Sequence, residues 1–148
     1  MKNVVLKKVD FGGWKKVLFF EKSCSCDVYH SITDEEEVKN YVRDDEVYFV
    51  VLDGDEVGTV SYEDKEGRAH VTGLTILPEY RGRGIATFVI WELLKKLKSL
   101  DNVSLDVHPE NSPAIILYLK NGFVIKKWNA NRFGEGEHRL FLVRDLKN

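Results

Sequence analysis

Residues 74–87 join a strand pattern to a helix pattern through a loop of arginine and glycine, which constrains the fold more than any other stretch. They read Leu-Thr-Ile-Leu-Pro-Glu-Tyr-Arg-Gly-Arg-Gly-Ile-Ala-Thr. The β-branched residues before Pro78 predict a strand, and the apolar spacing after Gly84 predicts an amphipathic helix. The first amides of a helix lack intrahelical acceptors, and the helix dipole favours an anion there. Because glycines admit a ligand to the backbone and arginines add positive charge, residues 81–87 are predicted to hold a phosphorylated ligand. A tight turn with two solvated arginines is the simpler alternative.

The whole sequence predicts elements in the order β-α-α-β-β-β-α-β-α-β-β. The strands are expected at residues 4–9, 47–52, 57–62, 69–77, 103–107, 123–128 and 140–143. The helices are expected at residues 14–21, 33–43, 85–98 and 112–121. Thr33 and Ser112 are the expected caps of the second and fourth helices, and residues 63–67 are expected to form a turn. This order predicts one α/β domain over residues 1–148, with a mixed sheet of about seven strands and helices on both faces.

Composition and charge exclude several classes of function. The chain carries 22 basic and 24 acidic residues, a formal net charge of -2, so no general attraction to nucleic acid is expected. No apolar run approaches the ~20 residues that cross a bilayer, and the N-terminus lacks the apolar core of a signal peptide. We therefore expect a cytoplasmic protein with no membrane or nucleic-acid partner.

Cys24 and Cys26 form a Cys-x-Cys pair with His30 nearby. Cysteines two apart rarely bridge each other, and a tetrahedral metal site needs one more ligand than these side chains provide. We expect two free thiols in a loop or at a helix end, and no bound metal.

A second motif, at residues 111–118, makes the interpretation of the glycine loop more specific. Residues 81–86 fit the pattern Gln/Arg-x-x-Gly-x-Gly/Ala, and residues 111–118 fit Asn-x-x-Ala-x-x-x-Tyr with Gly-Phe at 122–123. Two motifs in this order, separated by one helix and one strand, resemble the GNAT family of N-acetyltransferases. The element order is also the one expected of a GNAT-like fold.

The resemblance implies acetyl-CoA as cosubstrate. It implies that the backbone of residues 74–76 bonds the pantetheine arm like an added strand, and that one of these amides polarises the thioester carbonyl. The pyrophosphate is expected on residues 81–87. The expected cofactor-binding residues are Leu74, Thr75, Ile76, Arg81, Gly82, Arg83, Gly84, Ile85, Ala86, Thr87, Asn111 and Tyr118.

Tyr118 and Asp106 are the expected catalytic residues. Tyr118 lies four residues after Ala114, on one face of a short helix, and a phenol placed there can give a proton to the departing CoA thiolate. The resemblance implies this general-acid role. Asp106 stands where the ribosomal-protein alanine N-acetyltransferase branch has a catalytic glutamate, and its shorter side chain favours a bridging water. A satisfied core tyrosine and a polar residue at the sheet rim are the simpler interpretations.

Two strands are expected to line the acceptor side. Ser104, Asp106 and His108 alternate onto one strand face, and His108 is an alternative base. His70 and Thr72 are expected to share a strand face with Leu74, where they line the acceptor side or face the core.

Residues 131–140 resemble the loop of N-terminal protein acetyltransferases. Those enzymes carry two tyrosines and later Asp-Ala there, whereas this chain has Arg132-Phe133 and His138-Arg139. The resemblance implies direct attack by a primary amine in a ternary complex, with a peptide N-terminus preferred over a small amine. A plain hairpin explains the same glycines. A small-molecule amine acetyltransferase and a non-catalytic acetyl-CoA sensor or subunit are the alternatives, as a monomer or homodimer.

Overall fold

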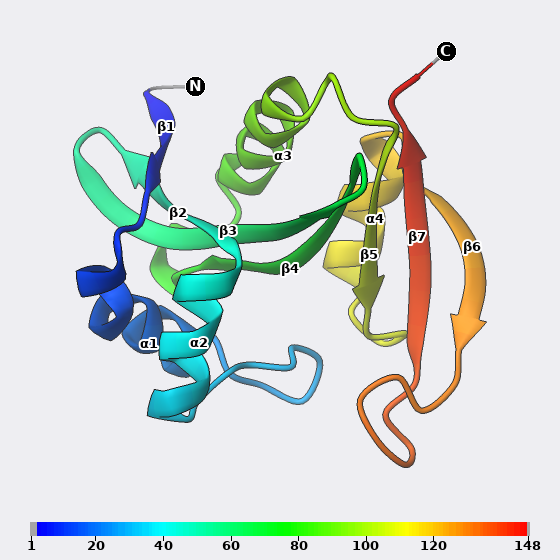
Figure 1. Cartoon of the computed structure of the whole chain (residues 1–148), viewed down its shortest axis with the longest axis horizontal. Coiled ribbons are helices and arrows are strands. Elements are labelled where there is room, and N and C mark those ends of the chain that lie inside the picture. Colours follow the sequence, from blue (N-terminus) through cyan, green and yellow to red (C-terminus); the bar gives the residue numbers. More distant parts are fainter. Residues whose placement is uncertain (1–2, 148) are drawn as a thin grey trace.

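The computed structural model describes residues 3–147 as one seven-stranded sheet with α-helices on both faces (Figure 1). The strands are β1 (Val4–Lys8), β2 (Glu46–Leu52), β3 (Asp55–Lys65), β4 (Arg68–Ile76), β5 (Asn102–Val107), β6 (Val124–Asn129) and β7 (Arg139–Asp145). The helices are α1 (Trp14–Ser23), α2 (Glu35–Asp44), α3 (Ile85–Lys96) and α4 (Ser112–Lys120), with 3-10 turns η1 (Phe11–Gly13) and η2 (Pro78–Tyr80). This confirms the predicted mixed α/β fold and element order.

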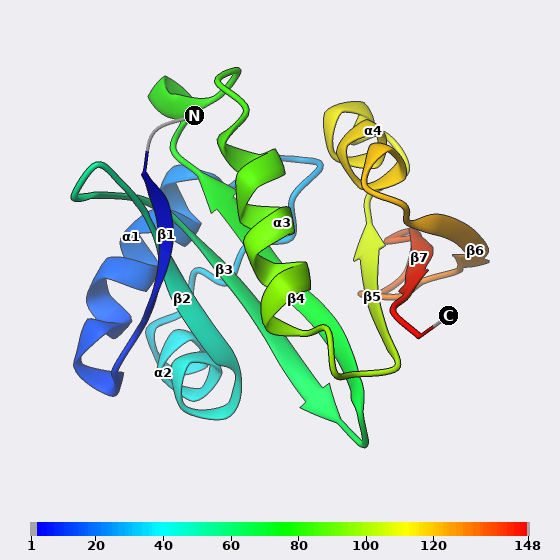
Figure 2. The same ribbon diagram turned by 90° about the horizontal axis from the view of Figure 1, so that it is seen from above.

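The sheet separates two apolar cores. Its strand order is β1-β2-β3-β4-β5-β7-β6, and every neighbouring pair is antiparallel except the parallel pair β4 and β5. α1 and α2 cover one face, and α3 crosses the other (Figure 2). α3 packs through Ile85, Val89, Ile90 and Leu93, and burying each such side chain contributes about 1.5–3 kcal/mol. The predicted apolar stripe of this helix therefore anchors the glycine loop that precedes it.

A β-bulge in β4 corrects one expectation about strand faces. Ser61 pairs with Gly73 and Tyr62 pairs with Val71, so Thr72 is an extra residue in β4. The extra residue shifts the alternation of side chains, because each residue normally turns the next to the opposite face. Leu74 consequently packs against the α3 core, whereas Thr72 bonds to Asp45 at the end of α2. The prediction that His70, Thr72 and Leu74 share one face is wrong.

β4 and β5 part beyond this bulge. They pair only where residues 68–71 of β4 lie beside residues 102–105 of β5. A bulge bends its strand and increases the local twist, which explains why the two strands diverge here (Figure 1). The last residues of β4 therefore keep an edge that β5 does not cover.

Two predicted helix caps are each displaced by one residue. Asp34, rather than Thr33, caps α2, and its carboxylate accepts a backbone amide at 3.0 Å. Asn111, rather than Ser112, caps α4, and its carbonyl oxygen accepts a backbone amide at 3.3 Å. Aspartate and asparagine are cap residues at least as good as the hydroxyl residues beside them, so neither correction changes the helix predicted.

The turn between β3 and β4 is shorter than predicted. β3 continues to Lys65, and only Glu66 and Gly67 connect it to β4, with φ angles of 54° and 80°. Two consecutive positive φ angles form a tight hairpin turn that matches the twist of the strands. Elsewhere, none of the helices within residues 3–147 is long and apolar enough to cross a membrane.

Candidate functional site

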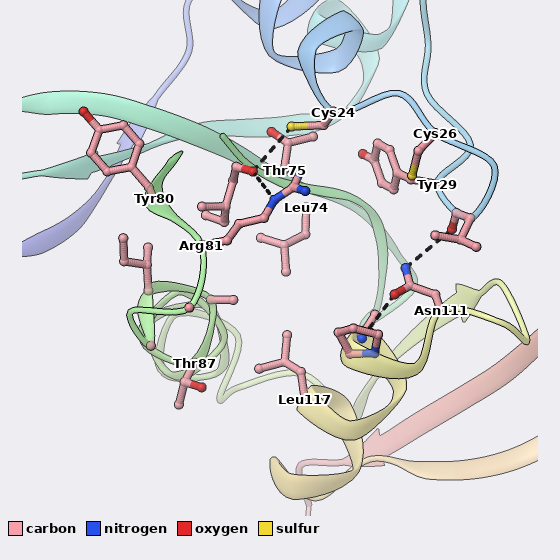
Figure 3. Close-up of a pocket in the computed structure, with 18 of the residues that line it drawn as sticks. Cys24, Cys26, Tyr29, Leu74, Thr75, Tyr80, Arg81, Thr87, Asn111 and Leu117 are labelled. Carbon is pink, nitrogen blue, oxygen red and sulfur yellow. Dashed lines mark hydrogen bonds between the residues drawn. The ribbon is translucent and has the colours of Figure 1, made fainter. Parts of the chain in front are cut away.

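A cleft of about 500 Å³ opens where β4 leaves β5. Figure 3 shows Cys24, Tyr29 and Thr75 on one side of it and Thr87 and Leu117 on the other. Ten of the twelve residues predicted to bind a cofactor line it: Leu74, Thr75, Ile76, Arg81, Gly82, Gly84, Ile85, Ala86, Thr87 and Asn111. The side chains of Arg83 and Tyr118 lie elsewhere.

The glycine loop presents backbone amides and one arginine to this cleft. Gly82 and Gly84 have φ angles of 75° and 78°, a conformation that favours glycine. Phe88 donates its amide to the carbonyl oxygen of Gly84 at 3.3 Å, so the amides of residues 85–87 precede the first helical bond. Such amides are suited to an anion. The start of α3 therefore offers the backbone donors on which the predicted phosphate site depends.

The two arginines of the loop have different surroundings. Arg81 lines the cleft and donates from Nε to the carbonyl oxygen of Ile76 at 2.8 Å. Arg83 donates to the carbonyl oxygen of Glu79 at 3.1 Å, and its guanidinium lies 5.3 Å from the centre of the Tyr80 ring. Arg81 is thus placed to reach a ligand, whereas Arg83 braces the loop.

The end of β4 offers hydrogen-bonding groups to an extended ligand. The bond from Arg81 shows that the carbonyl of Ile76 points out of the ladder with β3, toward the cleft. Leu74, two residues earlier, presents its backbone to the same edge because strand residues alternate. An extended arm can therefore pair with this edge as a strand would.

Both cysteines line the cleft as free thiols. Cys24 ends α1 and donates from its thiol to the carbonyl oxygen of Ile76 at 3.5 Å, while Cys26 is exposed in the following loop. Burial raises the pKa of the Cys24 thiol, although the guanidinium of Arg81 opposes this shift. Cys24 therefore favours the neutral thiol and is a poor nucleophile.

A smaller pocket of about 130 Å³ adjoins the cleft beside β5 and α4. The two cavities share six lining residues: Val28, Tyr29, Leu74, Asn111, Ala114 and Leu117. Tyr118 and Asp106, the two predicted catalytic residues, both line the smaller pocket. A ligand in the cleft and a second ligand in the pocket would meet at these shared residues.

Tyr118 is held as a neutral phenol. Its residue is 6% exposed and its ring packs edge-on against Phe123, with 5.4 Å between the ring centres. Burial raises the pKa of the Tyr118 phenol well above its ordinary value. The group therefore keeps its proton at neutral pH and can act as a donor.

Asp106 is not a free carboxylate. Its side chain is 4% exposed, and one oxygen lies 3.0 Å from Nε of Arg132 and 3.3 Å from Nε2 of His70. Burial alone would raise the pKa of Asp106, but the hydrogen bonds and charges of His70 and Arg132 outweigh it and lower the pKa. A carboxylate stabilised in this way is a weak proton acceptor.

His108, the alternative base, also lines the pocket. Its Nδ1 accepts the backbone amide of Glu110 at 3.1 Å. In the neutral ring the proton then lies on Nε2, which makes this nitrogen a donor. Nδ1 of His108 is therefore already used as an acceptor within its own turn.

The loop between α1 and α2 forms one wall of the smaller pocket, and no sequence pattern predicted this. Glu21 accepts the hydroxyl of Tyr29 at 3.1 Å and the amide of Ile32 at 3.0 Å. His30, further along the loop, stacks on Phe133 with 4.5 Å between ring centres. The stacking of His30 on Phe133 joins segments more than a hundred residues apart, so only the fold brings them together.

Among residues 3–147, no group of three or more His, Cys, Asp or Glu side chains is arranged to hold a metal ion.

Comparison with known proteins supplies the family. Residues 14–123 match the acetyltransferase (GNAT) family, and this range spans the end of β4, the glycine loop and α4. The chain belongs to the GNAT family. Members of this family use acetyl-CoA as cosubstrate.

Relatives of this GNAT protein match parts of their length. An N-alpha-acetyltransferase of Saccharolobus solfataricus is 33% identical over 82 residues, which cover 53% of this chain and 49% of the relative. The L-amino acid N-acetyltransferase AaaT of Escherichia coli is 31% identical over 103 residues, covering 63% of this chain and 64% of the relative. The chain thus spans about half the length of the N-alpha-acetyltransferase.

Solved structures share the fold at low identity. The ribosomal-protein-S18-alanine N-acetyltransferase from Escherichia coli superposes with a TM-score of 0.84 at 13% identity, covering 99% of this chain and 96% of that chain. A chimera of spermidine N-acetyltransferase SpeG from Vibrio cholerae and hSSAT gives 0.83 at 19% identity, covering 97% and 95%. At these identities the likeness concerns the fold alone.

Proposed function

We propose that this GNAT protein, as one domain over residues 1–148, transfers the acetyl group of acetyl-CoA to a primary amine. The observation that carries the proposal is the junction of the two cavities, beside which a buried neutral phenol stands. The long cleft suits the extended cosubstrate, and the small pocket suits the amine. Both relatives described above are named as N-acetyltransferases, which supports the same chemistry.

In this proposal the pyrophosphate of acetyl-CoA binds at the start of α3. Arg81 contributes positive charge, and the amides of residues 85–87 contribute hydrogen-bond donors. The pantetheine arm runs along the free edge of β4 at Leu74 and Ile76. The thioester then lies near Asn111 and Leu117, where the cleft meets the pocket.

The amine attacks the thioester carbonyl carbon directly, within a complex that holds both substrates. A C–N bond forms and the C–S bond breaks, so the departing thiolate needs a proton or a hydrogen bond. The nitrogen loses one proton to solvent as the amide forms, and solvent returns a proton to the donor. Tyr118 is the proposed donor because its phenol remains protonated and lines the acceptor pocket. A backbone amide of β4 is the proposed donor to the carbonyl oxygen.

The ion pairs of Asp106 affect which class of amine can react. We propose that Asp106 acts on the acceptor through a water molecule, as a hydrogen-bond acceptor more than as a strong base. A weak base suits an α-amine with a pKa of about 7.7–8.0 better than a lysine-like amine near 10.4. The proposed acceptor is accordingly the α-amine of a peptide N-terminus, with a small amine as the alternative.

Labelled acetyl-CoA and mass spectrometry test this function. The acceptors would be short peptides with free N-termini, peptides in which only a lysine is free, polyamines and aminoglycosides. Label on peptide α-amines would support the proposal, and label only on a small amine would favour the alternative acceptor. Bound acetyl-CoA with no labelled product from any amine would overturn the proposed transfer and favour a cofactor-binding module.

A further inference from the structure

The acceptor pocket contains a buried cation that the proposed transfer does not use. Arg139, the first residue of β7, is 3% exposed and lines the smaller pocket beside Asp106 and His108. Burying a charge is costly unless it is paired and hydrogen-bonded. The groups that contact Arg139 therefore show how well its charge is compensated within the protein.

These contacts occupy only some of the N–H donors of the Arg139 guanidinium. Arg139 donates from Nη1 to the carbonyl oxygen of His138 at 2.7 Å, and its guanidinium lies 5.0 Å from the centre of the Phe133 ring. Its anionic partner is Glu137, at 3.4 Å from Nη2, and the side chain of Glu137 is 51% exposed. A guanidinium carries five N–H donors in a fork that matches a carboxylate. A long contact to an exposed loop carboxylate is weak, so a better-placed anion can replace it.

The charges of the other groups around the smaller pocket do not favour a polycation. Asp106 is its lining carboxylate, and His70 and Arg132 already hold that charge. Glu21, behind Tyr29, does not line the pocket, and burial raises the pKa of its carboxyl group. With Arg139 present and Asp106 paired, the pocket repels additional positive charge more than it attracts it.

We propose that the acceptor carries a carboxylate close to its amino group, and that Arg139 binds this carboxylate in place of Glu137. This inference rests on the proposed acetyl transfer and specifies its substrate class. The carboxylate can come from the side chain of an N-terminal aspartate or glutamate of a peptide, or from the α-carboxylate of a free amino acid. Both sources offer the same bidentate partner to the guanidinium.

The same contact helps the chemistry. A carboxylate beside an ammonium group raises its pKa, whereas a nearby guanidinium disfavours the protonated amine. Arg139 would therefore offset the effect of the carboxylate it binds and increase the fraction of neutral, reactive amine. This matters because Asp106 is a weak base in its ion pairs.

Matched acceptors test the inference. Peptides that begin with Glu would be compared with otherwise identical peptides that begin with Gln, and free glutamate and alanine with their amides. We expect the carboxylate member of each responding pair to have a kcat/KM about tenfold or more higher, as for a charge-assisted bond. The peptide and amino-acid arms distinguish the two sources of the carboxylate. Equal kcat/KM values within all pairs would overturn the inference and leave the proposed transfer intact.

Variants locate the effect on Arg139. Arg139→Gln is expected to abolish the preference, while Arg139→Lys retains part of it because lysine keeps the charge but not the fork. Glu137→Gln avoids any change to the buried residue, and freeing Arg139 should raise kcat/KM for carboxylate acceptors about two- to fivefold. Glu135→Gln, an exposed acid on the same loop, serves as the control without effect. An unchanged preference in folded Arg139→Gln, or no gain in Glu137→Gln, would overturn the assignment.

Binding separates this inference from the proposed function. The same Glu and Gln peptides would be titrated by calorimetry into protein saturated with CoA. A tighter Glu peptide without any acetyl transfer would support the carboxylate site and contradict the acetyltransferase. Equal affinities of the Glu and Gln peptides, together with observed acetyl transfer, would contradict the carboxylate site and support the acetyltransferase.

Discussion

Nε of Arg81 donates to the carbonyl oxygen of Ile76 at 2.8 Å, which ties the glycine loop to the end of β4. The strand edge proposed for the pantetheine arm and the loop proposed for the pyrophosphate are therefore held in one arrangement. This bond uses one of the five N–H donors of the Arg81 guanidinium, and the proposed phosphate contact would use others. Arg83, two residues on, bonds away from the cleft, so the pair provides a variant and its control.

Arg81→Ala is expected to weaken acetyl-CoA binding about 10- to 100-fold, because it removes a charge-assisted contact and the tie to Ile76. Arg83→Ala should change the dissociation constant by less than about threefold, since its contacts are to Glu79 and Tyr80. Calorimetric titration with acetyl-CoA measures both. Equal losses in the two variants would contradict the different roles assigned to them.

Tyr118→Phe is expected to lower kcat by about 100-fold or more while acetyl-CoA binding stays within about twofold, because it removes only the proposed proton donor. The ring keeps its packing against Phe123, so the melting temperature should change little. Steady-state rates and a thermal melt measure both properties. A variant with the turnover of the wild type would remove Tyr118 from the mechanism.

The ion pairs of Asp106 predict a pH-dependent contribution to stability. The pKa of Asp106 is lowered in the folded protein, so the carboxylate stabilises the fold above its unfolded pKa of about 3.9. That contribution is lost as the pH falls through the lower folded pKa. Asp106→Asn is therefore expected to cost about 1–2 kcal/mol at pH 7, a value limited by the exposure of Arg132.

Urea unfolding of the wild type and Asp106→Asn from pH 7 to pH 3 checks this prediction. The difference in the free energy of unfolding should be constant above about pH 5 and shrink below about pH 4. Asp64→Asn, at an exposed position on β3, is the control. A difference that stays the same at pH 3 would argue against an ionised Asp106 in these contacts.

Asn111 is expected to serve two functions that substitutions can separate. Its oxygen caps α4, and its Nδ2 lies 3.5 Å from the carbonyl oxygen of Val28 in the loop above the cleft. Asn111→Ala should lower the free energy of unfolding by about 1 kcal/mol, whereas Asn111→Asp should retain the cap. If Asn111→Asp also raises the KM for acetyl-CoA, the contact to the loop matters for binding. Equal stability of all three proteins would contradict the capping role.

Local sequence determined much of the fold and of the cofactor half of the site. The stretch around Pro78 and Gly84 carries its own strand end, turn and helix start, so its geometry follows from neighbouring residues alone. The cap positions were displaced by one residue because Asp34 and Asn111 compete with adjacent hydroxyl residues for the same amides.

The smaller pocket, which is proposed to bind the acceptor, depended on contacts between distant segments. The bulge at Thr72 is defined by which residues of β3 it faces, and no residue type in β4 alone requires it. The burial of Arg139 and the stacking of His30 on Phe133 likewise arise from the packing of loops far apart in the chain. The sequence predicted Asp106 on a polar strand face. Its ion pair with Arg132 forms because the fold brings β5 beside the loop between β6 and β7, and no local sequence pattern shows this.

Acetyl-CoA and an amine are proposed to occupy the adjoining cavities and to react directly. The most direct test is the initial rate of labelled acetyl transfer while the concentrations of both substrates are varied in a matrix. Direct attack predicts reciprocal plots that intersect, and no label left on the protein after it is incubated with acetyl-CoA alone. Parallel plots together with a labelled protein would contradict the account, because they would require an acetylated enzyme.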